Sequence, residues 1–273
     1  MAVFIYLSHI YICYYCFMSE NKKPVIIALT GKGGVGKTTI SAIIVKLLCE
    51  LGRDKKILAI DADPAVGLST ALCVEPKLSL DDIRSEAVDV ANTGDISGAI
   101  DTIGQARYRI YDAIVECNDF CFLSIGRPES AGCYCKINTY LKSVIEDVAF
   151  NFDYVIIDGE AGIEQINRRV MDKVSHLIMV SDTSKKGLDV VSTIYNVANK
   201  LVMFDHAGVI INRVTDNNLL KHIKLDNLKV LSTIEADNNI TEFDLSGKSI
   251  LDLNDTNKSV IGVKKALVNL GIL

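Results

Sequence analysis

Gly31-Lys32-Gly33-Gly34-Val35-Gly36-Lys37-Thr38-Thr39 is the stretch that decides the fold of this chain. It contains the pattern Gly-x-x-x-x-Gly-Lys-Thr, which follows the apolar run Val25–Leu29 and precedes a second apolar run starting at Ile40. A strand, a glycine-rich turn and a helix start are the context that a phosphate-binding loop requires. In such a loop the backbone N–H groups and the helix dipole face an anion. The stretch therefore predicts a nucleoside triphosphate site.

The side chains of this loop have separate expected roles. Lys37 would reach the β- and γ-phosphates, and the Thr38 hydroxyl would ligate Mg²⁺. The alternative is a glycine turn with a chance lysine, but both the pattern and its context favour the phosphate loop. The residues expected to bind the nucleotide here are Gly31, Lys32, Gly33, Gly34, Val35, Gly36, Lys37, Thr38 and Thr39.

The composition suits one large α/β domain. A chain of 273 residues with 49% hydrophobic residues can fill a sizeable core. The formal net charge of −5 argues against nucleic acid as a partner. Eight unevenly spaced cysteines do not form the pattern of a disulfide scaffold. We therefore expect a cytoplasmic protein with free thiols, some of them available for metal.

The N-terminus differs from the rest of the chain. Residues 1–18 carry no formally charged side chain and are strongly apolar, but they lack the basic region and the cleavage site of a secretory signal. The segment is also short and rich in tyrosine for a membrane-spanning helix. We expect residues 1–17 to be an extension outside the functional fold, with a membrane or partner anchor as the alternative. Residues 18–273 would form the ATPase domain.

From Val25 onward, short apolar runs alternate with helical patterns. Continuous apolar strands separated by helices predict a mostly parallel sheet covered by helices on both faces, with ligands at the carboxyl ends of the strands. The expected strands are 25–30, 56–61, 120–125, 154–158, 176–181, 208–212 and 229–234. The expected helices are 38–51, 95–116, 138–149, 186–201 and 259–270.

Polar residues stand where these strands end. Asp158 ends a buried run, and its carboxylate is suited to hold Mg²⁺ through water. Asp63 is placed to orient a water molecule for attack on the γ-phosphate. For either aspartate the alternative is a helix N-cap or a turn residue. Gly162 belongs to the same expected nucleotide site, and Asn212 could pair its amide with a base edge or else cap a loop.

Lys32 adds a second cation to the phosphate loop, one that its own phosphate site does not obviously need. Together with Asp61–Pro64, Asp158–Gly162 and Asn212-Arg213, it makes the chain resemble the deviant Walker-A ATPases. That family of P-loop NTPases (SIMIBI class) includes the nitrogenase iron protein and the MinD and ParA ATPases. The resemblance implies a homodimer in which Lys32 crosses to the partner's nucleotide and stabilises transition-state charge, as an arginine finger does. Lys32, Lys37 and Asp63 would then be the catalytic residues.

Cys133 and Cys135 form the second informative stretch, a pair of thiols separated by one residue in a glycine-containing loop. Two thiols can face one metal but cannot fill a tetrahedral site, which needs four ligands. A two-fold dimer would bring two such loops together and supply four sulfur atoms. The alternatives are an ordinary pair of exposed thiols or a strained local disulfide. We expect Ni²⁺ or Zn²⁺ to bridge the dimer at Cys133 and Cys135.

Three segments around these thiols extend the resemblance to a narrower group. Gly126–Glu129, Gly132–Cys135 and Asp158–Glu164 are similar to segments of the CooC/AcsF-type nickel-insertion ATPases. That resemblance implies an ATP-dependent metallochaperone whose client is carbon monoxide dehydrogenase or acetyl-CoA synthase. The cofactors would be ATP and Mg²⁺, and neither nucleic acid nor a membrane is expected as a partner.

Two other functions fit parts of the same pattern. Four cysteines across a dimer also suit an iron–sulfur cluster, as in an electron-transfer ATPase of the nitrogenase iron protein type. A MinD/ParA-like spatial-organising ATPase would share the phosphate loop but has no use for Cys133 and Cys135.

Four other cysteines are expected to have a structural role. Cys49 and Cys73 have apolar neighbours and are expected in the core, as are Cys117 and Cys121, with transient metal hand-over as the alternative for the latter pair.

Overall fold

The predicted strands form one sheet. The computed structural model of the chain describes residues 23–273 apart from positions 53, 66, 94–103, 106–107, 127–134, 161, 163–165, 168–169, 202, 224 and 226–227. Its strands are β1 (Val25–Gly31), β2 (Ile57–Asp61), β3 (Val115–Glu116), β4 (Cys121–Ser124), β5 (Tyr154–Asp158), β6 (Lys173–Ser181), β7 (Met203–Val214) and β8 (Val230–Glu235). They are arranged in the order β3-β4-β2-β5-β1-β6-β7-β8, and every neighbouring pair is parallel except β3 and β4. The expected mostly parallel α/β fold is confirmed.

The central strands are buried on both faces, which explains their unbroken apolar sequences. All five residues of β2 are buried, as are the last five of the seven residues of β1. Side chains alternate between the two faces, so Ile27 packs in one hydrophobic cluster and Ala28 in the other. The register pairs Asp158 with both Leu29 and Asp61. The carboxyl ends of the three strands therefore meet at one edge of the sheet.

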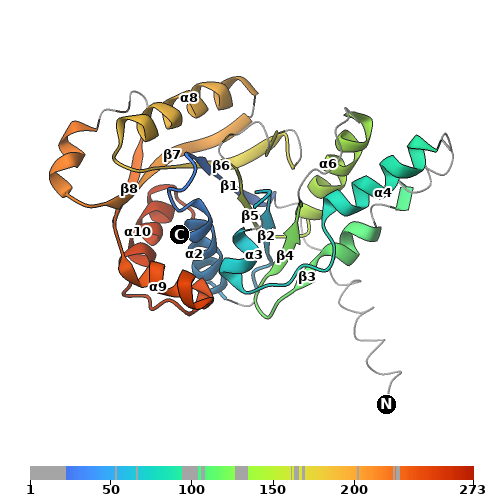
Figure 1. The fold of residues 1–273 in the computed structure, drawn as a ribbon, viewed down its shortest axis with the longest axis horizontal. Coiled ribbons are helices and arrows are strands. Elements are labelled where there is room, and N and C mark those ends of the chain that lie inside the picture. The colour runs from blue at the N-terminus through green and yellow to red at the C-terminus, as the bar shows by residue number, and fades with distance from the viewer. Residues whose placement is uncertain are drawn as a thin grey trace, which may run out of the picture.

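Helices cover both faces of the sheet, as Figure 1 shows. One face carries α2 (Lys37–Cys49), α3 (Gly67–Leu72), the short 3₁₀ helix η2 (Ile250–Asp252) and α10 (Lys258–Asn269). The other carries α4 (Leu80–Asn92), α6 (Cys135–Ala149) and α8 (Lys185–Leu201). The 3₁₀ helix η1 (Asn217–His222) follows β7, and α9 (Asn238–Ser246) follows β8.

The order of the strands reverses around β1. Strands β2, β3, β4 and β5 lie on one side of β1, whereas β6, β7 and β8 lie on the other. In open α/β sheets a ligand binds where the order reverses, outside the carboxyl ends of the strands. The phosphate loop, which leaves β1 at Gly31, stands at this point.

The expected helices did not include α3 or α9, and the largest difference from the expected pattern lies between β2 and β4. The predicted helix 95–116 is wrong at its end, because Val115 and Glu116 pair antiparallel with Phe122 and Cys121. Helix α4, which begins at Leu80, was not predicted at all. The turn between the paired segments brings β3 back onto β4, and this cross-strand pairing overrides the local helical pattern. Residues 94–103 lie outside the described part of the chain.

The expected N-terminal extension, residues 1–17, also lies outside the described residues. Among the helices that the structure does describe, none is long and apolar enough to span a bilayer.

Candidate functional site

The phosphate loop passes very close to the neighbouring strand β6. Gly31 ends β1 with a φ of 141°, and a Cβ at this position would lie 2.1 Å from the carbonyl oxygen of Val180. Gly36 is the N-cap of α2 with a φ of 92°, and its Cβ would lie 2.7 Å from Nδ2 of Asn212. Both positions combine a left-handed backbone with a close approach, so only glycine fits them without strain. The two glycines fix where the loop leaves β1 and where it enters α2.

Lys37, the first residue of α2, is 7% exposed. Its ammonium donates to the carbonyl oxygens of Gly31 at 3.4 Å and of Lys32 at 3.3 Å. The loop thus curls around the cation. These two neutral acceptors compensate the buried charge in part, and phosphate oxygens in the same place would form stronger, charge-assisted hydrogen bonds.

Asp158, the last residue of β5, is fully buried and contacts Ser41, which lies one helical turn after Lys37 on α2. Its Oδ1 accepts from the Ser41 hydroxyl at 2.8 Å, whereas Oδ2 has no hydrogen-bond partner. Burial raises the pKa of this carboxyl to about 6, and Asp63 adds to the shift, while the Ser41 and Thr38 hydroxyls and Lys37 oppose it. A free, buried carboxylate oxygen next to a threonine hydroxyl fits the hard oxygen donors that Mg²⁺ prefers. The observed groups are therefore compatible with the expected Mg²⁺ site.

Asp61, at the end of β2, organises the segment that follows it. Its Oδ2 accepts from the backbone N–H groups of Leu68 at 3.0 Å and Ser69 at 3.3 Å, and its Oδ1 accepts from that of Asp63 at 3.3 Å. Burial, followed by the nearby charge of Asp158, raises the pKa of Asp61 to about 7. This carboxylate holds the turn that presents Asp63 to the site. Sequence reasoning gave Asp61 no role, although its place after a buried strand was a usable signal.

A cavity of about 420 Å³ opens in front of the phosphate loop. Its walls include the expected residues Gly33, Gly34, Gly36, Lys37, Thr38 and Asp63. They also include Glu160 and Arg213, which sequence reasoning left without a role. Arg213 has a φ of 57°, an uncommon backbone conformation for a residue other than glycine. Both residues follow the buried part of a strand, so the rule that placed Asp63 would also have found them.

Asn212 holds the phosphate loop in this structure. Its Nδ2 donates to the carbonyl oxygen of Val35 at 2.8 Å, in a buried hydrogen bond across 177 positions of sequence. The amide thus ties the end of β7 to the loop. The expected contact with a base edge stays a prediction.

The Lys32 side chain reaches the segment between β6 and α8. Its ammonium donates to Oδ2 of Asp182 at 2.8 Å and to the Ser184 hydroxyl at 3.4 Å. Partial burial alone would raise the pKa of the Asp182 carboxyl, but the Lys32 ammonium and hydrogen bonds from Ser184 hold that pKa below its usual range. Within one protomer, this lysine is therefore bound by a carboxylate of the same chain.

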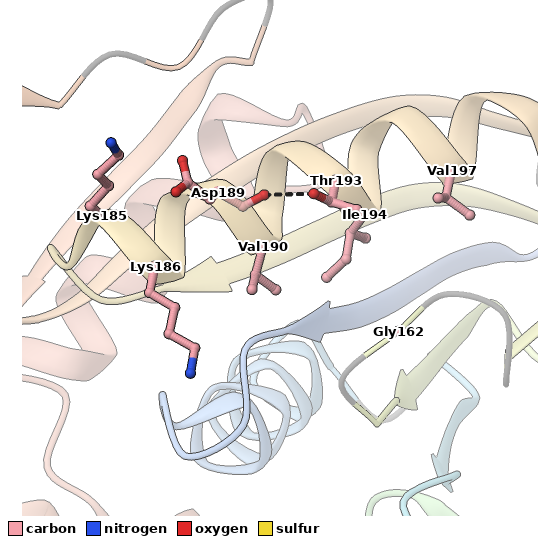
Figure 2. Close-up of a pocket in the computed structure, with 8 residues that line it drawn as sticks. All are labelled: Gly162, Lys185, Lys186, Asp189, Val190, Thr193, Ile194 and Val197. Carbon is pink, nitrogen blue, oxygen red and sulfur yellow. Dashed lines mark hydrogen bonds between the residues drawn. The ribbon is translucent and has the colours of Figure 1, made fainter.

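Gly162 lies on a second, larger hollow of about 550 Å³, which Figure 2 shows along α8. The opposite wall is formed by α8 residues that include Lys186, Val190 and Ile194. The phosphate cavity includes Glu160 but not Gly162 among its lining residues. The structure thus places Gly162 beside the phosphate cavity, and its contact with nucleotide stays a prediction.

Cys133 lies outside the described residues, and Cys135 is described only as the first residue of α6. Their loop follows β4, whose last residue Ser124 pairs with Asp61. The loop therefore starts at the same edge of the sheet as the phosphate site. Among the described side chains, no group of three His, Cys, Asp or Glu residues is already arranged to hold a metal ion. The expected nickel or zinc site is not tested by this geometry.

Comparisons with known proteins agree with this architecture. Residues 26–250 match the family described as the CobQ/CobB/MinD/ParA nucleotide binding domain. The uncharacterized ATP-binding protein MJ0685 of Methanocaldococcus jannaschii is 33% identical over 251 residues, covering 89% of this chain and 98% of that protein. The carbon monoxide dehydrogenase accessory protein CooC of Rhodospirillum rubrum is 28% identical over 250 residues, covering 84% and 90%. The solved structure of the cell division ATPase MinD of Pyrococcus furiosus has a TM-score of 0.65 at 22% identity, covering 92% and 99%.

Proposed function

Because the chain belongs to the CobQ/CobB/MinD/ParA nucleotide-binding family, we propose that it is a dimeric ATPase that loads a metal ion into a client enzyme. The cargo would be nickel, and the client carbon monoxide dehydrogenase or acetyl-CoA synthase. The observation that carries this proposal is the pair Cys133 and Cys135, in the stretch of sequence between β4, which ends at the same edge of the sheet as the phosphate site, and α6. The similarity to CooC over most of both chains supports it.

The residues of the phosphate site would have separate roles in ATP hydrolysis. Lys37 would bind the β- and γ-phosphate oxygens, and Thr38 and Asp158 would hold Mg²⁺, with Asp158 acting through water. The bound Mg²⁺ would neutralise charge on the phosphates. Asp63, held by the turn that Asp61 organises, would orient the attacking water. The low-dielectric surroundings of Asp158 and Lys37 favour this electrostatic stabilisation.

Dimerisation would give Lys32, the second lysine of the phosphate loop, a new binding partner. In one protomer Lys32 is bound to Asp182, with side chains 28% and 29% exposed. A partly exposed ion pair of this kind contributes only about 0.2–1 kcal/mol, so a triphosphate of the partner can compete for the lysine. Lys32 would then leave Asp182 and stabilise charge on the partner's nucleotide. ATP binding would thereby favour the closed dimer, as linkage requires.

The closed dimer would form the cargo site. Two copies of the loop before α6 would supply four thiols, enough for a closed tetrahedral thiolate site. A site shared by two protomers gains affinity when ATP closes the dimer and loses it after hydrolysis. This coupling is what a metal-loading enzyme needs in order to bind its cargo and then release it.

Metal analysis of anaerobically purified protein, with and without ATP, tests the proposal. We expect about one nickel or zinc ion per dimer. The double variant Cys133→Ser/Cys135→Ser should lose this ion and still bind ATP, whereas Cys121→Ser, a matched thiol on β4, should keep both. An unchanged metal content in the double variant would contradict the proposal. Iron and sulfide in a brown preparation would instead indicate an electron-transfer ATPase.

A spatial-organising ATPase is the second candidate, because the fold is also that of MinD. Such a protein would respond to the surface on which it cycles. Stimulation of ATP hydrolysis by lipid vesicles or DNA, unchanged in Cys133→Ser/Cys135→Ser, would favour it over metal loading.

A further inference from the structure

Three aromatic side chains, those of Tyr108, Tyr111 and Phe150, form an exposed aromatic patch, at 75%, 43% and 61% exposure. Tyr108 and Tyr111 lie three positions apart in the helical residues 108–113, so they share one face. The amide of Asn151 donates to the Tyr111 hydroxyl at 3.4 Å, which brings the adjacent Phe150 to this face. Every other Phe and Tyr among the residues that the structure describes is buried or half-buried. Apolar side chains that gather in this way mark an interaction surface.

The chain enters its first strand close to this patch. The backbone N–H of Val25 donates to the carbonyl oxygen of Asp153 at 2.8 Å. Asp153 follows Phe150 by three residues, which span at most about 10 Å of extended chain. Strand β1 runs from Val25 to Gly31, where the phosphate loop begins. The aromatic patch therefore lies near the amino ends of the strands, away from the phosphate site.

The sequence before β1 has a composition that matches the aromatic patch. Residues 3–17 carry no formally charged side chain, and six of these 15 residues are Phe or Tyr. Eight residues lead from Phe17 to Val25 and can span up to about 28 Å, so the stretch can reach the patch. Because it belongs to the same chain, its effective concentration at the patch is about millimolar. A second copy in dilute solution lacks this advantage.

We propose that residues 3–17 dock on the aromatic patch of their own chain. The contact would remove apolar surface of both partners from water, and pairs of aromatic rings would add to this attraction. The tyrosine hydroxyls of the patch can keep their hydrogen bonds to Asn151 or to water. This contact involves none of the residues that line the phosphate cavity. It is therefore independent of ATP binding and of the metal loading proposed above.

Cys13 and Cys16 lie inside the docking stretch, so their reactivity reports on the contact. The probe is iodoacetamide, added to the reduced full chain without nucleotide, and mass spectrometry follows the alkylation of both thiols. The variant Tyr108→Asp/Phe150→Asp places charges at the two most exposed positions of the patch. We expect both thiols to react at least about tenfold faster in this variant than in the parent, because alkylation follows the population of undocked chain.

Leu245→Asp is the matched control, because Leu245 is 84% exposed on α9 and does not belong to the patch. This variant should keep the alkylation rates of the parent, and unchanged ATP affinity in both variants shows that the fold is intact. Equal rates in the parent and in Tyr108→Asp/Phe150→Asp would overturn the proposal. Protection that is lost on dilution would overturn it in favour of a second copy, and protection that requires phosphatidylcholine vesicles would overturn it in favour of a membrane anchor.

Discussion

The two ends of α2 carry polar groups that are organised in opposite ways. At the first residue, Lys37 is buried, donates to two carbonyl oxygens and lies near the buried Asp158. At the last residue, Cys49 shares an open cavity with two other thiols, and its Sγ has only a weak contact, 3.7 Å, to the carbonyl oxygen of Asp119. The first end places its charged groups before any ligand arrives, whereas the described thiols at the second end form no group that could hold a metal ion.

This difference has a physical origin in the cost of buried charge. Lys37 and Asp158 carry opposite charges, so each lowers the cost of burying the other. The thiols are neutral when protonated, so a half-buried cavity can hold them without a counter-charge. Permanent buried charges must therefore be arranged in advance, whereas neutral thiols need no such arrangement. Four predictions, from the largest expected effect to the smallest, test how strongly the groups around the first end of α2 are preorganised.

Removing the charge at the first end should have the largest effect. Lys37→Ala should weaken ATP binding about 100-fold or more, because a buried, hydrogen-bonded charge is worth about 2–5 kcal/mol. The control is Lys46→Ala, nine residues along the same helix, where the lysine binds Glu50 and Asp255 at the surface. That variant should keep its ATP affinity within about twofold. Isothermal titration calorimetry measures both, and equal losses in the two variants would contradict the contrast.

The loop backbone should tolerate a methyl group at one glycine and not at another. Gly31→Ala would place its Cβ 2.1 Å from a backbone oxygen of β6 and should lower the free energy of unfolding by about 3 kcal/mol or more. At Gly33 a Cβ meets no atom within 4 Å, so Gly33→Ala should change this free energy by less than about 0.5 kcal/mol. Urea unfolding of the nucleotide-free protein measures the free energy of unfolding of both variants. Similar losses would mean that the loop lies farther from β6.

The two carboxylates should make the nucleotide-free protein less stable as the pH rises. The pKa values of Asp61 and Asp158, about 7 and about 6, lie above the value of 3.8 for an ordinary carboxyl. The folded state therefore binds more protons than the unfolded state, and its stabilisation at low pH is lost as the pH rises through about 6 to 7. We expect the free energy of unfolding to fall by roughly 4 kcal/mol between about pH 5 and pH 8.

The same urea experiment at both pH values, repeated with Asp61→Asn, assigns this loss. The amide keeps an acceptor oxygen for the backbone N–H groups of Leu68 and Ser69 but does not titrate. The fall in stability between the two pH values should shrink by about two thirds in the variant. A fall of the same size as in the parent would show that other groups cause it.

Releasing Lys32 should have the smallest effect. Asp182→Ala removes an ion pair worth about 0.2–1 kcal/mol from each of the two protomers, so the ATP-bound dimer should tighten by about two- to thirtyfold. Sedimentation with a non-hydrolysable ATP analogue measures the dimer dissociation constant. Asp189→Ala, an exposed carboxylate on α8, should leave that constant unchanged. A weaker dimer in Asp182→Ala would mean that this carboxylate helps to position Lys32 across the interface.

Local signals in the sequence predict the framework of this molecule well. Strand β5 has the predicted bounds, and the phosphate loop lies between β1 and α2 as expected. In these segments, burial and turn chemistry leave their pattern in consecutive residues. The same holds for Asp158, whose position at the end of a buried strand placed it in the site.

Contacts between distant segments could not be predicted in this way. Lys32 and Asp182 are 150 positions apart, and no pattern around either residue indicates the other. The apolar neighbours of Cys73 predict burial, but the end of α3 turns this residue outward. The shared cavity with Cys49 and Cys117 exists only because the fold brings three separate segments together. Chemistry that depends on tertiary packing leaves no spacing signal.

The outer strands of the sheet have a consequence for how copies of the chain associate. At one edge, β3 is only two residues long and antiparallel to its neighbour. At the other edge, the pairing of β8 with β7 is interrupted by register shifts. Short or irregular edges offer few aligned N–H and C=O groups to a strand of another molecule, which protects against edge-to-edge aggregation. Both edges therefore disfavour growth of the sheet from chain to chain, which leaves association to the loops and helices.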